Sequence, residues 1–331
     1  MNLNHMIVLA QHPHCRVQEQ DFQLTSNSIK SPEINEVLVK NKWLSIDPYV
    51  KGRINKADSY AKNIALGEVI TGQAIGHVLE SNSIKFKVGD LVTGMMGWQT
   101  HALMHHENLR HITDTTMPLT CFLGAAGMPG ITAWLGIHKI CAPKNGEIFV
   151  VNAATGAVGS VAGQLAKQMG CRVIGIAGSA KKCEYAKSVL GFDECISHQD
   201  VNWFNYLSKL APNGIDCLFE NVGGKLFDSI IPHMNRFGRI ALCGLISEND
   251  FEKTHQINLR HFLNKRLHLQ AFIASDYLDE WSSIQTQLIS LIKCNDLKYS
   301  ESISMGIESA PSAFVGMLNG NNLGKQLVQL Y

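Results

Sequence analysis

The chain has 331 residues, of which 45% are hydrophobic and 17% charged, as in an ordinary globular protein of about two domains. A formal net charge of +1 excludes the basic surface that sequence-independent binding of nucleic acid requires. Nine scattered cysteines without a C-x-x-C pair predict reduced thiols in the cytoplasm. Met1–Met6 lack signal-peptide features, and no stretch reaches the roughly 18 apolar residues of a membrane helix.

The first 120 residues have the composition of short strands between turns. Strands are predicted at 37–39 and 75–79, and residues 88–92 have the pattern of a turn that leads into a strand. Glycines recur at turn spacing throughout this part. The pattern favours an antiparallel barrel or sandwich.

From Leu119 onwards, helical patterns alternate with compact apolar runs. Helices are predicted at 157–169, ended by Gly170, and at 180–190, ended by Gly191. Strands are predicted at 147–152, 172–177, 216–220, 238–243 and 267–273. Strands that alternate with helices in this order predict a parallel sheet covered on both faces.

The last part of the chain returns to short elements, with a helix at 312–318 and a strand at 326–330. The sequence therefore predicts a domain built from both ends of the chain, residues 1–120 plus 299–331. A doubly wound Rossmann domain, residues 121–298, is inserted between them.

A variant of the dinucleotide fingerprint G-x-G-x-x-G lies between the first strand and the first helix of the parallel part, with Ala154 at the first glycine position. Gly156 lets the backbone approach a pyrophosphate, and Gly159 lets helix and strand pack closely. The start of the following helix offers N–H groups and a positive dipole end to an anion.

The choice of cofactor depends on the end of the second strand. Enzymes that use NAD usually place an acidic residue about twenty residues after the fingerprint, where it binds the ribose hydroxyls. Here the segment contains Ser179, Lys181 and Lys182 and no acid, which favours the 2′-phosphate of NADPH. The alternative is that the two lysines are only the solvated start of a helix.

Six segments carry a resemblance to a known family: 44–49, 127–133, 151–159, 220–224, 237–244 and 322–325. Through them the chain resembles the medium-chain dehydrogenase/reductase superfamily, over nearly its whole length. Within it, the chain is similar to the zinc-independent branch of alkenal/one oxidoreductases, prostaglandin reductases and curcumin reductases. The resemblance implies a GroES-like, mostly antiparallel β-barrel domain for the substrate. It also implies a homodimer that uses NADPH to reduce the carbon–carbon double bond of a small α,β-unsaturated aldehyde or ketone.

The resemblance also implies a set of cofactor-binding residues. Met128 and Thr132 are expected near the nicotinamide, and Lys182 at the 2′-phosphate. For Met128, Cys243 and Phe272, a plain place in the hydrophobic core is the alternative. The remaining cofactor contacts are expected at Thr155, Gly156, Ala157, Val158, Gly159, Ser179, Asn221, Cys243, Phe272, Ile273 and Asn322.

Two positions depart from the family pattern. Many relatives carry a tyrosine shortly after the Cys-Gly-x-Ile-Ser turn, thought to hydrogen-bond the substrate oxygen, where this chain has Asn249. Relatives also often carry a tyrosine after the second helix, where this chain has His198, expected to contact the cofactor. The first departure affects the choice of substrate, and the second affects only the cofactor site.

The expected reaction transfers a hydride to the β-carbon of an enone, so that negative charge develops on the carbonyl oxygen as an enolate. Donors aimed at that oxygen lower the barrier. Tyr49 and Asn249 are the catalytic candidates, and a buried structural tyrosine is the alternative for Tyr49.

No metal site is expected, because zinc-dependent relatives have Gly-His-Glu where this chain has Gly76, His77 and Val78. The dense histidines at 101, 105, 106 and 111 lie in a segment that has the pattern of strand and loop. The rival functions are an NADPH-dependent quinone oxidoreductase and a non-catalytic NADPH-binding protein. Turnover of NADPH with an enone, with a quinone or with neither separates the three.

Overall fold

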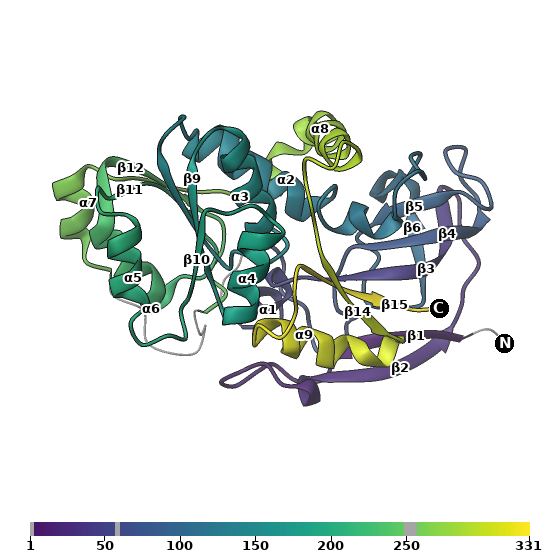
Figure 1. The fold of residues 1–331 in the computed structure, drawn as a ribbon. Helices are drawn as coiled ribbons and strands as arrows, with labels where there is room; N and C mark the ends of the chain where they lie inside the picture. The colour runs from purple at the N-terminus through teal and green to yellow at the C-terminus, as the bar shows by residue number, and fades with distance from the viewer. Residues whose placement is uncertain (1–2, 57–59, 248–256) are drawn as a thin grey trace. The chain divides into compact units, whose positions relative to one another are not determined.

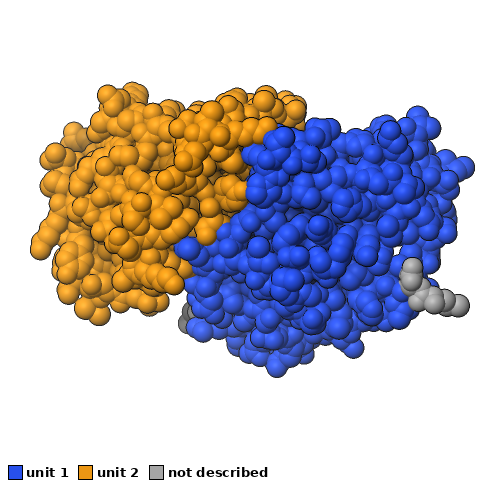
Figure 2. Space-filling model, turned by 45° about the vertical axis from the view of Figure 1, so that its right-hand side comes forward, with its two compact units in different colours: residues 1–123, 249–252, 301–331 blue, residues 124–248, 253–300 orange. Residues whose placement is uncertain are grey.

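The computed structural model describes residues 3–56, 60–247 and 257–331 (Figure 1). These residues form two compact units, which Figure 2 shows in different colours. The first unit contains the described residues of 1–123 and 301–331. The second contains the described residues of 124–247 and 257–300.

The second unit is built on a parallel sheet of six strands, in the order β10-β9-β8-β11-β12-β13 (Figure 1). In chain order from β8, this is third, second, first, fourth, fifth and sixth, the order of a Rossmann sheet. The strand order reverses between β8 and β11. The strands are β8 (Ile148–Asn152), β9 (Arg172–Ala177), β10 (Glu194–Ser197), β11 (Ile215–Glu220), β12 (Met234–Leu242) and β13 (His268–Ala271).

Helices cover both faces of this sheet, which confirms the predicted parallel α/β arrangement. Along β8, Phe149 and Val151 join the core cluster that includes α3, while Val150 faces a second cluster that includes α5 and α6. Alternate side chains of a strand point to opposite faces, so an apolar run buries both. The helices are α2 (Met128–Leu135), α3 (Gly159–Gln168), α4 (Ala180–Ser188), α5 (Trp203–Leu210), α6 (Gly224–Ile230), α7 (Leu259–Lys265) and α8 (Trp281–Lys293).

The first unit combines a two-stranded sheet, β1-β2, with a sheet of seven strands. The larger sheet has the order β14-β15-β3-β4-β5-β7, and β6 pairs with β3; of these pairs only β14–β15 is parallel. The described strands do not close into a barrel. The elements are β1 (Leu3–Leu9), β2 (Phe22–Ser28), β3 (Glu36–Ile46), α1 (Tyr49–Arg53), β4 (Ala74–Ser81), β5 (Leu91–Gly94), β6 (His101–His105), β7 (Leu109–His111), β14 (Glu301–Met305), α9 (Ala310–Leu318) and β15 (Lys325–Gln329).

Three aromatic side chains hold together the distant parts of the first unit. The ring of Trp98 lies 5.5 Å from that of Phe314 in α9, and the Phe22 ring of β2 lies 5.9 Å from Phe314. Trp98 and Phe314 are fully buried. The core of this unit therefore depends on residues from both ends of the chain.

No helix in the described ranges has the length and apolar composition needed to cross a lipid bilayer. The longest of them, α8, has 13 residues, whereas a bilayer-spanning helix needs about 20.

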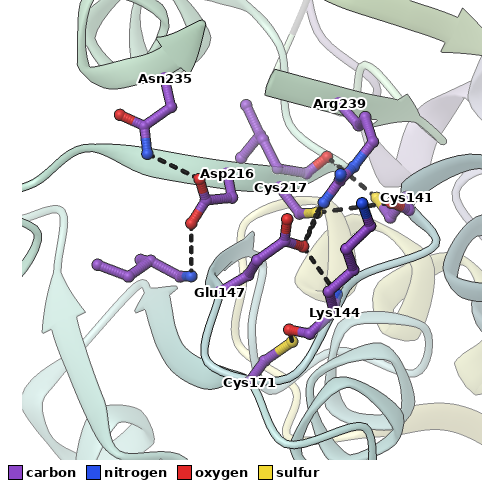
Figure 3. Close-up of polar contacts among 10 residues, drawn as sticks. Cys141, Lys144, Glu147, Cys171, Asp216, Cys217, Asn235 and Arg239 are labelled. Carbon is purple, nitrogen blue, oxygen red and sulfur yellow. Dashed lines mark hydrogen bonds and ion pairs between the residues drawn. The ribbon is translucent and has the colours of Figure 1, made fainter. Parts of the chain in front are cut away.

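A polar network holds together the amino ends of three strands of the parallel sheet (Figure 3). The Glu147 carboxylate accepts hydrogen bonds from the Lys144 N–H at 2.7 Å and from the Arg239 guanidinium of β12. Asp216 of β11 accepts from the Ile148 N–H at 2.9 Å and from the Asn235 amide at 2.7 Å. These contacts link the amino ends of β8, β11 and β12 to one another.

We expect Glu147→Gln to lower the free energy of unfolding by about 1–3 kcal/mol, because Arg239 then remains in its largely buried position without a counter-charge. Both side chains are only 21% exposed. Chemical denaturation measures the loss. The matched control is Glu107→Gln, which removes a charge from the exposed Lys85–Glu107 pair and should change stability little. Equal losses in the two variants would contradict the assigned role of Glu147.

Candidate active site

Buried polar side chains meet at the carboxyl ends of β8 and β11, where the strand order reverses. Glu220 Oε1 accepts hydrogen bonds from Asn152 Nδ2 at 2.5 Å and from the N–H groups of Val222 and Gly223 at 2.7 and 2.8 Å. Asn221 donates its N–H to Asn152 Oδ1 at 2.7 Å and its amide to the Asn152 carbonyl at 3.0 Å. In open α/β sheets, ligands bind at such a reversal, so this network shapes the floor of the expected cofactor crevice.

The fingerprint loop follows β8 directly. Its tight turn is at Ala153, with a φ of +45°, and Gly156 N–H donates to the Ala153 carbonyl at 2.8 Å. The left-handed position is thus one residue before Ala154, the position that the sequence aligned with the first glycine. A Cβ at Gly159 would lie 2.4 Å from the Ala153 carbonyl oxygen, so only glycine fits where α3 begins. Helix α3 starts two residues later than predicted because this turn extends to Val158.

The residues of this loop are only partly accessible. Gly156, Ala157 and Val158 are half-buried, and Thr155 is buried. Among the described residues, no side chain caps the start of α3. An anion placed there would meet N–H groups and the positive end of the helix dipole.

A second group gathers at the carboxyl end of β9. The Ser179 hydroxyl accepts a hydrogen bond from the Lys182 N–H at 3.3 Å and so caps α4. The His198 N–H donates to the Ala177 carbonyl at 3.0 Å, and burial followed by the nearby charge of Lys182 lowers the pKa of His198. Burial lowers the pKa of Lys182 from 10.5. The structure therefore brings Ser179, Lys182 and His198 together at one turn.

The remaining predicted cofactor-binding residues of the second unit differ in how deeply they are buried. Met128 begins α2, and the Thr132 hydroxyl donates to the Met128 carbonyl at 2.8 Å. Burial, and then the Glu220 carboxylate, raise the pKa of the half-buried Cys243 thiol to about 12, so it stays neutral. The Phe272 ring packs edge-on against Phe219 in the core, with centroids 6.3 Å apart. The Phe272 side chain is thus part of the hydrophobic core, which was the alternative to a contact with the cofactor. Ile273, the next residue, is half-buried.

In the first unit, a buried ion pair joins two segments that are far apart in the sequence. Lys325 Nζ lies 2.6 Å from Asp47 Oδ1 and donates to the Ile46 carbonyl at 2.7 Å. The two side chains are only 4% and 5% exposed. The Ser45 hydroxyl donates to the other carboxylate oxygen of Asp47. This pair fixes the segment that precedes Tyr49 against the start of β15.

Tyr49 opens helix α1, two residues after Asp47. Its hydroxyl oxygen is buried, and no described residue forms a well-aligned hydrogen bond with it. Burial, and then the charge of Asp47, raise the pKa of Tyr49 well above its ordinary value of 10. The hydroxyl therefore keeps its proton at neutral pH and is a potential donor.

Two predicted site residues remain, Asn322 and Asn249. The Asn322 amide donates to the Gly324 carbonyl at 2.8 Å, which shapes the loop before β15. Asn249 lies outside the described residues.

Within the described residues, no group of three or more His, Cys, Asp or Glu side chains is placed to hold a metal ion. His77 lies in β4, and His101 and His105 lie in β6, both of which pair with β3. The histidines of this region are thus spread over a sheet.

Sequence reasoning missed four buried polar residues: Asp47 and Lys325 in the first unit, and Asn152 and Glu220 in the second. Each is an ionisable or amide side chain at the end of an apolar strand, and each lies in a segment that carried the family resemblance. A search for polar residues that are enclosed by buried strands would have found them.

The chain was compared with protein-family models and with curated proteins. Residues 5–112 match the model described as "N-terminal domain of oxidoreductase", and residues 157–293 match "Zinc-binding dehydrogenase". A 2-alkenal reductase (NADP(+)-dependent) of Nicotiana tabacum is 40% identical over 99% of this chain and 97% of the relative. The chain belongs to the medium-chain dehydrogenase/reductase superfamily. The NADPH-dependent curcumin reductase of Escherichia coli (strain K12), 38% identical over 99% and 97% of the two chains, places it in the branch of NADP-dependent alkenal, curcumin and prostaglandin reductases.

Solved structures of the superfamily agree with this membership. CurA from Vibrio vulnificus, solved alone and in complex with NADPH, superposes with a TM-score of 0.94 at 40% identity, over 99% of each chain. The Escherichia coli quinone oxidoreductase complexed with NADPH has a TM-score of 0.80 at 20% identity, over 98% of this chain and 99% of that one. The second likeness shows the fold alone. As a member of this branch, the chain is an oxidoreductase.

We expect Asp47→Asn and Lys325→Met each to lower the free energy of unfolding by about 3–5 kcal/mol, because each leaves one buried polar partner uncompensated. The double variant Asp47→Asn/Lys325→Met removes both charges and should lose less than the sum of the single variants. Chemical denaturation of the four proteins measures the coupling. Strictly additive losses would show that the two side chains do not stabilise each other.

Proposed function

We propose that the enzyme reduces the carbon–carbon double bond of α,β-unsaturated aldehydes and ketones, with NADPH as the hydride donor. The observation that carries the proposal is the buried Tyr49 hydroxyl, which remains protonated and has no well-aligned partner among the described residues. The similarity to a 2-alkenal reductase supports it, because a 2-alkenal is a conjugated aldehyde.

The chemistry divides between the cofactor and the chain. Bound NADPH supplies the hydride, and the protein supplies orientation and electrostatics. Hydride arriving at the β-carbon pushes charge onto the carbonyl oxygen, where Tyr49 donates a hydrogen bond to the developing enolate. Asn249 is the second proposed donor. An enolate is a weaker base than an alkoxide, so neutral donors are enough to stabilise it.

The cofactor is NADPH, and we assign its contacts to the residues gathered at the carboxyl edge of the sheet. The pyrophosphate lies on the backbone of Gly156, Ala157 and Val158, at the start of α3. The 2′-phosphate lies at the Ser179–Lys182 turn, beside His198. Met128, Thr132, Asn221, Cys243 and Ile273 line the nicotinamide and ribose, and Phe272 contributes its backbone. For Asn322, which belongs to the first unit, contact with the cofactor stays a prediction from the family resemblance.

We assign the substrate and the cofactor to different domains. We assign the substrate to a GroES-like domain, residues 1–120 plus 299–331, and NADPH to a Rossmann domain, residues 121–298. The division of the described chain into two compact units supports this assignment. Expression of residues 121–298 alone and measurement of NADPH binding tests it.

The enzyme acts as a homodimer in the cytoplasm. Strand β13 is at the edge of the parallel sheet, and Leu259 and Leu263 of α7 are 71% and 76% exposed. An open strand edge and exposed apolar side chains favour association. Nine cysteines that form no disulfide suit a reducing compartment. Light scattering, which gives the mass in solution, and cell fractionation test these two assignments.

Cofactor preference is the first test. We expect NADPH to bind about 10- to 100-fold more tightly than NADH, because a charge-assisted contact to phosphate contributes about 1.5–3 kcal/mol. Lys182→Ala should remove most of this preference, while Lys181→Ala, at the exposed neighbouring residue, should retain it. Titration calorimetry measures both affinities. Equal dissociation constants for the two cofactors in the unmodified enzyme would rule out the assigned phosphate site.

The second test follows the reaction. A small enone should give the saturated ketone, and Tyr49→Phe should lower kcat with almost unchanged binding of NADPH. Loss of one such donor costs about 2.7–4 kcal/mol in enclosed oxyanion sites, and a wetter pocket should lose less. Product analysis and steady-state kinetics measure both. An allylic alcohol as the main product would overturn the reaction, and turnover with quinones alone would favour a quinone oxidoreductase. Undiminished kcat in Tyr49→Phe would remove only the tyrosine from the mechanism.

The third test concerns metal. We propose that turnover needs none, because Val78 follows His77 where a zinc enzyme of this superfamily carries a glutamate. Activity should survive chelation, and elemental analysis should find no stoichiometric zinc. Loss of turnover on chelation, restored by added zinc, would contradict the proposal.

A further inference from the structure

The buried carboxylate of Asp47 accepts a hydrogen bond on each of its two oxygens. Oδ1 accepts from Lys325 Nζ at 2.6 Å, and Oδ2 accepts from the Ser45 hydroxyl. Both donors are themselves buried, and Lys325 also donates to the Ile46 carbonyl at 2.7 Å. A buried charge is tolerated when such partners compensate it, so the two donors decide how much of the Asp47 charge acts on its surroundings.

A second carboxyl group lies on the other neighbouring strand of Lys325. Glu301 of β14 is opposite Lys325 of β15 in the parallel register, whereas Asp47 directly follows β3. Burial raises the pKa of the Glu301 carboxyl, against a hydrogen bond with Thr120 and the charge of Lys325. The ion pair of Lys325 is with Asp47. Glu301 therefore offers a matched position at which a carboxyl can be changed without removing either partner of the pair.

Asp47 affects Tyr49, the proposed donor to the substrate, through its backbone and through its charge. The Asp47 carbonyl accepts the N–H of Val50 at 3.3 Å, within the first turn of α1. After burial, the charge of Asp47 is the largest cause of the raised pKa of Tyr49; Tyr60 acts in the same direction and Arg53 opposes it. Proton donation follows Brønsted behaviour, so the uncompensated charge at Asp47 determines how well Tyr49 donates.

We propose that Lys325 is a positioning residue for the reduction and that it acts through Asp47. Its ammonium anchors the segment at which α1 begins and compensates the Asp47 charge, which leaves the Tyr49 hydroxyl available to the substrate oxygen. This role rests on the proposed function, because it requires that Tyr49 donates to the developing enolate. The effect of Lys325 on Tyr49 itself does not.

Loss of the ammonium leaves the Asp47 carboxylate with the Ser45 hydroxyl as its remaining side-chain donor. The charge is then largely uncompensated in a buried place. It makes Tyr49 a weaker donor and attracts the Tyr49 hydroxyl, in competition with the substrate. The assigned phosphate site at the Ser179–Lys182 turn belongs to the second unit and contains none of these groups. The proposal therefore predicts a loss in the chemical step without a loss in the binding of NADPH.

Steady-state kinetics of the full-length enzyme with a small enone test the role. We expect Lys325→Met to lower kcat about tenfold, less than the loss of the donor itself, with an almost unchanged dissociation constant for NADPH. The variant Asp47→Asn/Lys325→Met removes the charge together with its partner and should recover most of kcat. A role of Lys325 in packing alone predicts no recovery, and a double variant as slow as Lys325→Met would overturn the proposal.

Two further variants separate the role from general damage. In the Tyr49→Phe background, Lys325→Met should cause little further loss of kcat, because the donor through which it acts is already absent. Equal losses with and without the hydroxyl would overturn the proposal. The matched control is Glu301→Gln, which changes the other carboxyl beside Lys325 and should retain kcat. A loss as large as that of Lys325→Met would show that Asp47 has no special part.

A milder variant keeps the test informative if Lys325→Met does not fold. Ser45→Ala removes the other side-chain donor from Asp47 and leaves the ion pair in place. We expect kcat to fall in the same direction by a smaller factor, with unchanged binding of NADPH. If Lys325→Met is unfolded and Ser45→Ala has an undiminished kcat, the proposal is wrong.

A second measurement needs no turnover. The seven tyrosines are labelled with ¹³C at Cζ, and Tyr49→Phe identifies the Tyr49 resonance. Because the Cζ shift responds to hydrogen bonding of the hydroxyl, the resonance should move in Lys325→Met and return in Asp47→Asn/Lys325→Met. An unmoved resonance would overturn the effect of Lys325 on Tyr49. A resonance that moves as expected, in an enzyme that does not reduce enones, would overturn the proposed function and leave only that effect.

Discussion

The unit built on the parallel sheet depends on the fully buried carboxylate of Glu220. A buried charge is costly unless it accepts hydrogen bonds, and Glu220 Oε1 accepts three of them, from the side chain of Asn152 and from the N–H groups of Val222 and Gly223. The bond to Asn152 ties the end of β8 to the end of β11, the two strands between which the strand order reverses. Gly223 follows with a φ of +76°, and this conformation lets its N–H point back to the carboxylate.

The polar contacts at the two edges of the parallel sheet differ. At the amino edge, the charges of Glu147 and Arg239 pair with each other, and Asp216 accepts hydrogen bonds from Asn235 and Ile148. At the carboxyl edge, the buried side chains of Asn152 and Glu220 hydrogen-bond to each other, and no side chain in the described part of the chain caps the start of α3.

The sequence predicted the elements whose apolar period is regular. The strands at 147–152 and 172–177 and the helix at 180–190 are present with small differences at their ends, because buried strands and amphipathic helices have strong patterns. Helices α2, α5 and α8, the β1–β2 pair and strand β10 were not predicted. In β10, only four residues long, the period is too short to recognise, and the pairing of β1 with β2 depends on contacts between separate segments. The strand order and the contact between Asp47 and Lys325 depend on residues far apart in the sequence, so no local sequence pattern predicts them.

The sequence predicted those parts of the candidate site in which a local motif determines the backbone conformation. Gly156 and Gly159 were recognised because the close approach of the backbone excludes side chains, and Gly159 indeed leaves no room for a Cβ. The tight turn itself lies one residue before the position aligned with the first glycine, at Ala153, which adopts a conformation for which sequences usually supply glycine. The group formed by Ser179, Lys182 and His198 needs β9 and β10 side by side, which is a property of the sheet.

The pairing of β15 with β3 has a consequence for how the protein is made. Asp47 and Lys325 are 278 positions apart, and residues 43–46 of β3 lack one of their neighbours until β15 has been synthesised, whereas residues 36–40 pair with β6. Synthesis runs from the amino end, and the whole parallel sheet of the second unit emerges first. The nascent chain thus carries an incomplete sheet with an open strand edge for most of translation, and such edges recruit other chains. The first unit can therefore complete its larger sheet only after β15 has been synthesised, later than every strand of the second unit.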